Sequence, residues 1–207
     1  MSRIIEVHPE HPQPHRIGEV VKVLEQGGVI AYPTESGYAL GCLLDNKQGA
    51  ERIRAIRRLP PDHDFTLMCR DLSELATYAR VDNQTFRALK GHTPGAFTFI
   101  LEATSEVPKR LMHPKRKTIG MRVPDNAIAL ALMEELGEPL MTSSLLLPGE
   151  EYPLTDPYDI RQTLEHQLEL VIDGGFCGME ATTVIDMTGD APELLRQGLG
   201  DASDFID

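Results

Sequence analysis

The chain has 207 residues, of which 41% are hydrophobic and 25% are charged, a composition typical of a globular protein that can bury a full core. Its formal net charge is −12 and its pI is about 5.0. This acidic balance excludes a protein whose whole surface binds nucleic acid, but it is compatible with a local basic groove.

Cysteine usage and hydropathy favour a reducing compartment. The three cysteines, Cys42, Cys69 and Cys177, lie far apart in or near apolar runs, so we expect reduced core residues rather than metal ligands. No apolar run reaches about 18 residues, the length that a membrane-spanning helix needs. The start of the chain is too short and too charged for a signal peptide, so we expect a cytoplasmic protein without membrane contact.

Residues 1–15 form a Pro/His-rich N-terminal segment. Its prolines argue against a helix before residue 16. His8, His11 and His15 have intervals that could suit a metal ion, but only a helix would hold them in place. We therefore predict no metal site in this segment.

Hydrophobic periodicity after this segment predicts alternating helices and strands. Apolar residues recur at helical spacing over 16–26, 47–58, a segment from 71, a segment from 82, 126–136 and 156–166. Short apolar runs predict strands over 28–33, 64–69, 96–102, 117–123, 139–144, 168–172, 183–187 and 193–196. Alternation of this kind predicts an α/β fold with a sheet covered on both faces, and no repeat or linker divides residues 1–207 into two domains.

A polar loop follows the first of these strands. Pro33 ends the strand because it has no N–H to give to a sheet, and Thr34, Glu35, Ser36 and Gly37 come next. Hydroxyls, a carboxylate and a glycine suit a pocket floor, where loop N–H groups can face an anion. An ordinary hairpin connection is the alternative.

Four strand ends carry polar or cationic groups, at 34–36, Arg122, 142–144 and Arg196. In an open α/β sheet ligands bind where strand ends meet, and the planar guanidinium of arginine holds phosphate oxygens in pairs. We therefore predict a pocket for phosphate and a small polar group. Simple ion pairs of Arg122 and Arg196 with the many acidic residues are the alternative. The P-loop, GxGxxG, GxSxG and HExxH motifs are absent.

Five segments resemble, in the right order, motifs of the YrdC/YciO family, the relatives of threonylcarbamoyl-AMP synthase. Residues 32–41 resemble YPTET-x-YGLG, residues 93–98 resemble a PGP-x-T turn, residues 120–124 resemble G-x-R-x-P, residues 182–186 resemble STVVD and residues 195–198 resemble LRPG. Residues 65–75 and 115–124 are most similar to the YciO branch.

The resemblance implies a single-domain YrdC-like fold, a twisted mixed sheet flanked by helices around a concave, positively charged pocket. It implies a reaction that condenses ATP, L-threonine and bicarbonate into threonylcarbamoyl-AMP and pyrophosphate, which supplies a modification of tRNA. ATP would be a substrate, and Mg²⁺ would accompany it without a dedicated protein cage.

The resemblance also implies roles for particular residues. The catalytic residues would be Thr34, Arg57 and Ser143. The threonine and bicarbonate side would be lined by Thr34, Tyr38 and Arg57. The nucleotide or its phosphates would contact Arg122, Ser143, Thr183 and Arg196.

Two positions depart from the synthases of this family. Their K-x-R-P motif becomes residues 57–60 here, with Leu59 in place of the second cation, and their S-x-N becomes residues 143–145, with Leu145 in place of asparagine. Removing one cation or donor at a transferring phosphate lowers a rate by about 10²–10³-fold, so we expect a weak or altered activity. Arg54 or Arg58 could replace the missing cation by reaching round. We expect His63 to be a surface residue, because the family needs no histidine there.

A basic run supports an alternative function, a non-catalytic module that binds double-stranded RNA or tRNA. The predicted RNA-binding residues are Lys109, Arg110, Lys115, Arg116 and Lys117. Arginines at 52–58 would add positive potential, and binding would weaken steeply with salt. A solvated charged face is the other explanation of this run.

Overall fold

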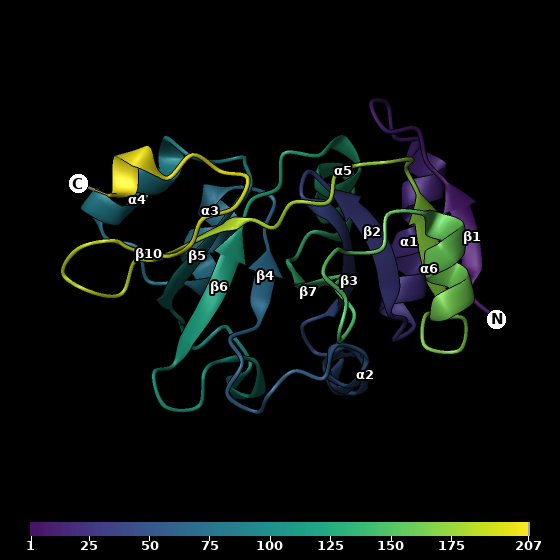
Figure 1. Ribbon diagram of the computed structural model, residues 1–207, viewed down its shortest axis with the longest axis horizontal. Helices are drawn as coiled ribbons and strands as arrows, with labels where there is room; N and C mark the ends of the chain where they lie inside the picture. Colours follow the sequence, from purple (N-terminus) through teal and green to yellow (C-terminus); the bar gives the residue numbers. More distant parts are fainter. Residues whose placement is uncertain (207) are drawn as a thin grey trace.

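One mixed β-sheet extends across the computed structural model, which describes residues 1–206 (Figure 1). Within these residues the strand order is β1-β8-β2-β3-β7-β4-β6-β5-β9-β10. The strands are β1 Arg3–Glu6, β2 Ile30–Thr34, β3 Gly37–Leu43, β4 Thr66–Met68, β5 Phe97–Glu102, β6 Thr118–Arg122, β7 Leu140–Ser144, β8 Leu170–Asp173, β9 Thr183–Asp186 and β10 Glu193–Arg196. Parallel and antiparallel pairs are interspersed, so the predicted α/β fold with a mixed sheet is confirmed.

Helices cover this sheet on both faces. The α-helices are α1 Pro14–Glu25, α2 Lys47–Arg57, α3 Leu72–Tyr78, α4 Asn83–Lys90, α5 Ala127–Leu136 and α6 Pro157–Thr163. Two short 3₁₀ segments lie at Lys109–Leu111 and Ser203–Phe205. No helix within residues 1–206 has the length and apolar content to cross a bilayer.

Side chains at the helix starts explain where several helices begin. The Asn46 carboxamide accepts a hydrogen bond from Gly49 N at the start of α2, and Asn126 accepts from Ile128 N and Ala129 N at the start of α5. At α3, Asp71 accepts from Glu74 N while the Glu74 carboxylate accepts from Arg70 N, which is the reciprocal pair of a capping box. These caps satisfy N–H groups that have no partner inside the helix.

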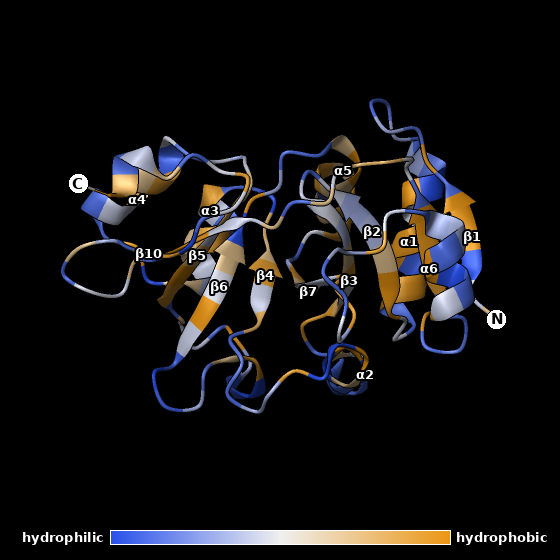
Figure 2. Cartoon of the chain, viewed as in Figure 1, coloured by the Kyte–Doolittle hydropathy of each residue, from blue (hydrophilic) through white to orange (hydrophobic). Residues whose placement is uncertain are grey.

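Side chains of alternating strand residues pack into two separate cores. In β2, Ile30 and Tyr32 join the core formed with α1 and α5, whereas Ala31 joins the larger core on the opposite face. Figure 2 shows the hydrophobic colour on the parts of α1 and α5 near the strands, and hydrophilic colour on the outer loops. This alternation fixes which face each strand residue serves.

The N-terminal region differs from its prediction. Residues Arg3–Glu6 form a strand that pairs in parallel with β8, and helix α1 begins at Pro14 rather than at residue 16. Proline is favourable at the first helical position because its missing N–H would have no partner there, and its fixed φ angle suits a helix. The expectation that no helix precedes residue 16 was therefore wrong by two residues.

Candidate functional site

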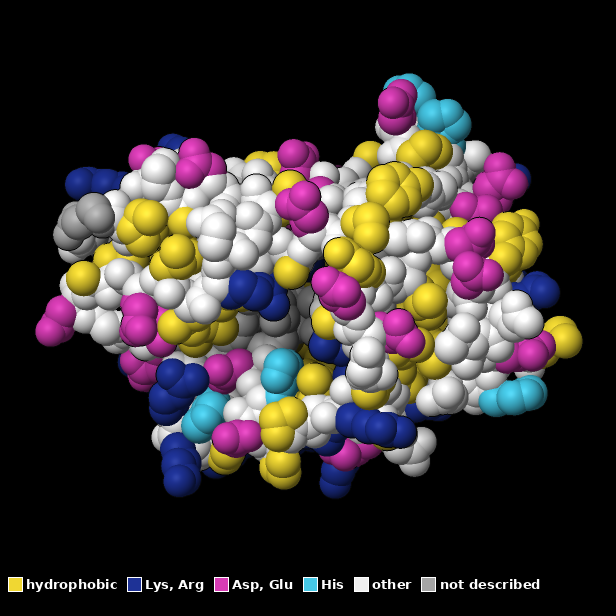
Figure 3. Space-filling model, viewed as in Figure 1, with side chains coloured by type: hydrophobic (Ala, Val, Ile, Leu, Met, Phe, Trp, Pro, Cys, Tyr) yellow, Lys and Arg dark blue, Asp and Glu magenta, His cyan; other side chains and the backbone are white. Residues whose placement is uncertain are grey.

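A cavity of about 460 Å³ lies over the half of the sheet formed by β7, β4, β6, β5 and β9. On one face of these strands Leu67, Phe99 and Met121 belong to the larger core, together with Leu75 of α3 and Leu89 of α4. On the other face the alternate residues line the cavity: Thr66, Thr98, Ile100, Arg122 and Val184. Figure 3 shows the resulting hollow near the middle of the visible face. Its volume lies in the range typical of small-molecule sites, about 300–1,000 Å³.

Gly120 of β6 lies at the bottom of the cavity, where a side chain would not fit. Gly120 pairs with Thr66 of β4 and with Ile100 of β5. A Cβ atom at this position would lie 2.7 Å from Thr66 Oγ1 and 3.2 Å from Thr98 Cγ2. Any larger residue at this position would displace the Thr66 and Thr98 side chains. The absence of a side chain at Gly120 therefore lets these two threonines pack against it at the bottom of the cavity.

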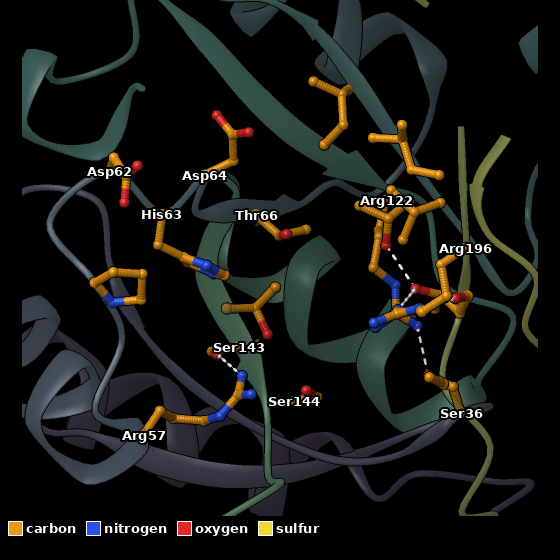
Figure 4. Close-up of a pocket in the computed structure, with 18 residues that line it drawn as sticks. Ser36, Arg57, Asp62, His63, Asp64, Thr66, Arg122, Ser143, Ser144 and Arg196 are labelled. Carbon is orange, nitrogen blue, oxygen red and sulfur yellow. Dashed lines mark hydrogen bonds between the residues drawn. The ribbon is translucent and has the colours of Figure 1, made fainter. Parts of the chain in front are cut away.

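Three arginines from separate elements reach the cavity (Figure 4). Arg57, the last residue of α2, donates from Nε to Leu146 O at 2.9 Å and from Nη1 to Ser143 Oγ at 2.6 Å. Arg196, at the end of β10, donates from Nε to Thr182 O at 2.9 Å and from Nη2 to Thr182 Oγ1 at 3.1 Å. Figure 4 shows Arg57 on one side of the cavity and Arg122 and Arg196 on the other.

Arg122 is the most buried of the three and has a carboxylate partner. Its side chain is 7% exposed, and Nη2 lies 2.7 Å from Glu35 Oε1 and 3.1 Å from Ser36 Oγ. Glu35 also accepts from Asp125 N at 3.0 Å. Arg122 Nε is buried and makes no hydrogen bond to any atom of residues 1–206. The ion pair agrees with the alternative explanation for Arg122, but it leaves a buried donor that a ligand could satisfy.

The arginines carry positive charge that the surrounding residues neutralise only in part. Burial lowers the pKa of Arg57, and Arg196 lowers it further. Partial burial likewise lowers the pKa of Arg196, and Arg122 adds to this effect. Within residues 1–206 neither Arg57 nor Arg196 has a carboxylate within ion-pair distance, whereas Arg122 does. Positively charged groups that lower one another's pKa in this way favour the binding of an anion between them.

The polar loop after β2 supplies Ser36 to the cavity, but the structure does not place Thr34 and Tyr38 in its lining. Thr34 is 1% exposed, and its hydroxyl donates to Gly37 O at 2.7 Å within the β2–β3 turn. Tyr38 is also 1% exposed, and its hydroxyl donates to Gly175 O at 2.8 Å. Thr34 thus stabilises the β2–β3 turn, whereas Tyr38 connects β3 to the segment that follows β8.

Thr183 faces away from the cavity. Its hydroxyl is fully buried, donates to Gly200 O at 2.6 Å and accepts from Gly198 N at 3.0 Å. The neighbouring Thr182 lines the cavity and shares a hydrogen bond of 2.7 Å with Thr98. The structure therefore places Thr182 rather than Thr183 in the cavity lining, since successive residues near a strand point to opposite faces. A nucleotide contact at either residue stays a prediction. The sequence gives no clear signal of this, because Val184 and Ile185 are both apolar although they lie on opposite faces.

The two departures from the synthase motifs lie outside the cavity lining. Leu145 is fully buried in the larger core, and Leu59 is half-buried against it. Arg54 lies over the Phe65 ring at 4.7 Å and donates to Pro60 O, and the exposed Arg58 is not among the residues that line the cavity. Neither arginine takes the place of the missing cation in this structure.

His63 lies in the cavity wall rather than on the outer surface, contrary to expectation. It belongs to the loop between α2 and β4, together with the cavity residues Pro60, Asp62 and Asp64. The sequence did not suggest that His63 reaches the cavity, because a residue in a loop has no regular spacing from the strand residues that it meets in the fold.

Several residues of the basic run at 109–117 contact other parts of the protein. Arg110 donates to Leu44 O, and its Nη1 is buried without a hydrogen bond to residues 1–206. Arg116 lies 3.1 Å from Asp64 and 3.7 Å from Asp186. Lys109, Lys115 and Lys117 are exposed, although Lys117 Nζ donates to Pro114 O. Three of the five residues predicted to bind RNA, Arg110, Arg116 and Lys117, therefore make side-chain contacts within the protein.

The residues described here offer no cage for a metal ion. Within residues 1–206 no three His, Cys, Asp or Glu side chains are grouped so that they could hold one. Mg²⁺ commonly keeps several waters and binds through substrate phosphates, so any Mg²⁺ in this cavity would be held mainly by the nucleotide.

Comparison with known proteins gives a consistent family and fold. The Sua5/YciO/YrdC family model, described as "Telomere recombination", matches residues 22–198. The YciO protein of Escherichia coli strain K12, described as uncharacterized, is 55% identical over 206 residues and covers 100% of both chains. Its crystal structure superposes with a TM-score of 0.97.

More distant relatives carry a named activity or ligand. The threonylcarbamoyl-AMP synthase of Vibrio vulnificus strain YJ016 is 30% identical over 183 residues, which is 87% of this chain and 97% of that protein. The structure of P. abyssi Sua5 complexed with L-threonine has a TM-score of 0.86 at 28% identity, covering 95% of this chain and 58% of that one.

Proposed function

Because the chain belongs to the Sua5/YciO/YrdC family, we propose that its cavity binds ATP and supports a reaction of the threonylcarbamoyl-AMP synthase type, in weak or altered form. The observation that carries this proposal is the convergence of Arg57, Arg122 and Arg196 on one cavity, with a carboxylate partner for Arg122 alone. A triphosphate is the kind of ligand that such a cluster would neutralise.

The proposed reaction has two stages, and these cations act in the second. L-Threonine and bicarbonate first give a carbamate with loss of water, and a carbamate oxygen then attacks the α-phosphorus of ATP. The new P–O bond forms as the bond to the bridging oxygen breaks and pyrophosphate leaves. Negative charge grows on the phosphate oxygens, and preorganised cations and hydroxyl donors stabilise it. Arg57 already orients the Ser143 hydroxyl, which leaves that O–H free to donate to the ligand.

The test of this proposal measures pyrophosphate release from ATP with Mg²⁺, and omits L-threonine or bicarbonate in turn. Release that depends on both substrates is the expected result for a synthase-type enzyme. Release that depends on neither would contradict the synthase reaction, and failure to bind ATP would contradict the nucleotide site itself.

An arginine variant tests whether ATP binds in the cavity or responds only to the net charge of the protein. Arg57→Gln is expected to weaken ATP binding about 10- to 100-fold, since a hydrogen bond to a charged group contributes about 1.5–3 kcal/mol. Arg52→Gln is the matched control, because Arg52 lies on the same helix but pairs with Glu169 at 2.8 Å away from the cavity. Calorimetric titration should show no change for the control. Equal weakening in both variants would mean that ATP responds only to net charge.

The second candidate function is binding of double-stranded RNA or tRNA without catalysis, and exposed Lys109, Lys115 and Lys117 favour it. If these three lysines neutralise phosphates, affinity should fall about 40-fold between 50 and 200 mM salt, given a slope of about −0.9 per phosphate. The triple alanine variant should lose this salt dependence, whereas a control with alanine at exposed Lys22, Lys47 and Lys90 should keep it. Binding that is absent or independent of salt would rule this candidate out.

A further inference from the structure

His63 is a cavity residue whose imidazole makes no hydrogen bond to any residue in the described range 1–206. Its backbone N–H donates to Pro60 O at 3.1 Å, and its ring packs edge-on against Phe65 with the ring centroids 5.8 Å apart. These contacts position the ring, and Figure 4 shows it projecting into the cavity on the side of Arg57. Within residues 1–206 its ring nitrogens make no hydrogen bond, so both remain available to a ligand.

Charged groups from two elements face this imidazole. Arg57 and Arg54 approach from α2, and Asp62 and Asp64 lie in its own loop. Asp64 already accepts from Thr118 Oγ1 at 2.9 Å and pairs with Arg116. Burial lowers the pKa of His63 below its usual 6.5 and Arg57 lowers it further, so the free protein holds His63 neutral at neutral pH.

An anion in the cavity reverses this balance. A phosphate group beside Arg57 would offset the positive charge that disfavours protonation of His63, and a protonated imidazole could donate to a phosphate oxygen. Arg57 presents the same charge at every pH, whereas the charge of His63 depends on whether the anion is present.

We propose that His63 is a proton-dependent ligand of the triphosphate chain: it takes up a proton from solvent when the anion binds, and its N–H then donates to a phosphate oxygen. This inference rests on the proposed function, since it requires a triphosphate in the cavity. It adds a fourth cationic contact that is absent from the free protein.

The sign of the pH dependence follows from the two states of His63. Its pKa is lowered in the free protein and raised in the complex, so proton uptake is greatest between these two values. Affinity for ATP should therefore rise as pH falls through the pKa of the complex, and level off below the pKa of the free protein. Each unit between the two pKa values corresponds to about a tenfold change in affinity.

The test is calorimetric titration of ATP near neutral pH in two buffers that differ in ionisation enthalpy. The wild type should take up more protons on binding ATP than His63→Gln does, by an amount between zero and one, because both proteins share any proton that ATP itself gains. His166→Gln, at an exposed position outside the cavity lining, should behave as the wild type does. At a pH well above the pKa of His63 in the complex, where this residue is neutral in both states, all three proteins should bind ATP with similar affinity.

Two outcomes distinguish this inference from the function on which it rests. Equal proton uptake by the wild type and His63→Gln, with ATP still bound, would overturn the role of His63 and leave the nucleotide site standing. No binding of ATP by the wild type at any pH from about 6 to 8 would overturn the proposed function and this inference together.

Discussion

Replacing Arg122 with alanine is expected to lower the free energy of unfolding by about 3–5 kcal/mol and to weaken ATP binding about 100-fold. The loss of stability follows from Glu35, whose side chain is 13% exposed and would be left as an unpaired carboxylate. The loss of binding follows from the buried guanidinium, which has a donor that no atom of residues 1–206 accepts. Urea unfolding and calorimetric titration of ATP measure the two effects separately.

A second substitution separates these two effects. Arg122→Ala combined with Glu35→Gln removes the unpaired charge, so it should recover much of the lost stability while ATP binding stays weak. Arg80→Ala is the control for an exposed pair, because Arg80 and Glu102 are 70% and 59% exposed. It should change stability by less than about 1 kcal/mol. Unchanged ATP affinity in Arg122→Ala would remove Arg122 from the nucleotide site.

Leu145→Asn is expected to destabilise the protein by about 4 kcal/mol and to give no gain of synthase activity. Leu145 is fully buried in the larger core, and its backbone N–H already donates to Tyr38 O at 3.0 Å. An asparagine there would leave a cavity and bury an amide among apolar side chains. Urea unfolding together with the pyrophosphate assay measures both results.

The other departure position provides the comparison. Leu59→Arg introduces the second cation at a half-buried position, where the stem of an arginine can pack while its head reaches water, so it should cost about 1 kcal/mol or less. A Leu145→Asn variant as stable as Leu59→Arg would contradict the packing described for Leu145. Gain of threonine-dependent pyrophosphate release in Leu145→Asn would show that the asparagine can act from that position.

The sequence predicted the elements and the main site better than it predicted which way individual side chains point. Helix and strand periodicity identified the α/β sheet, and four predicted residues, Arg57, Arg122, Ser143 and Arg196, lie around one cavity. Their functional roles remain predictions. Thr183 shows the limit of motif reading, because a motif identifies a segment, whereas a shift of one residue changes the face of the sheet.

Contacts between distant parts of the chain account for the other differences. Strand β1 exists because Arg3–Glu6 pairs with Leu170–Asp173, and no local periodicity in a Pro-rich segment signals such a partner. Arg110 belongs to a basic run by sequence, but a carbonyl of the β3–α2 region accepts its hydrogen bond. His63 reaches the cavity only because the loop after α2 folds beside β7 and β4, an arrangement set by tertiary packing.

The part of the sheet that lines the cavity separates the requirements of folding from those of ligand choice. Ile100 lies among the residues that line the cavity and belongs to neither core, while Phe99, the preceding residue of the same strand, belongs to the larger core. Lining positions such as Thr66, Thr98, Ile100 and Val184 can therefore change in size and polarity while the residues between them keep the scaffold intact. A chain built in this way can exchange one ligand for another through a few substitutions, and descendants of one ancestor can diverge in ligand choice without passing through an unstable intermediate.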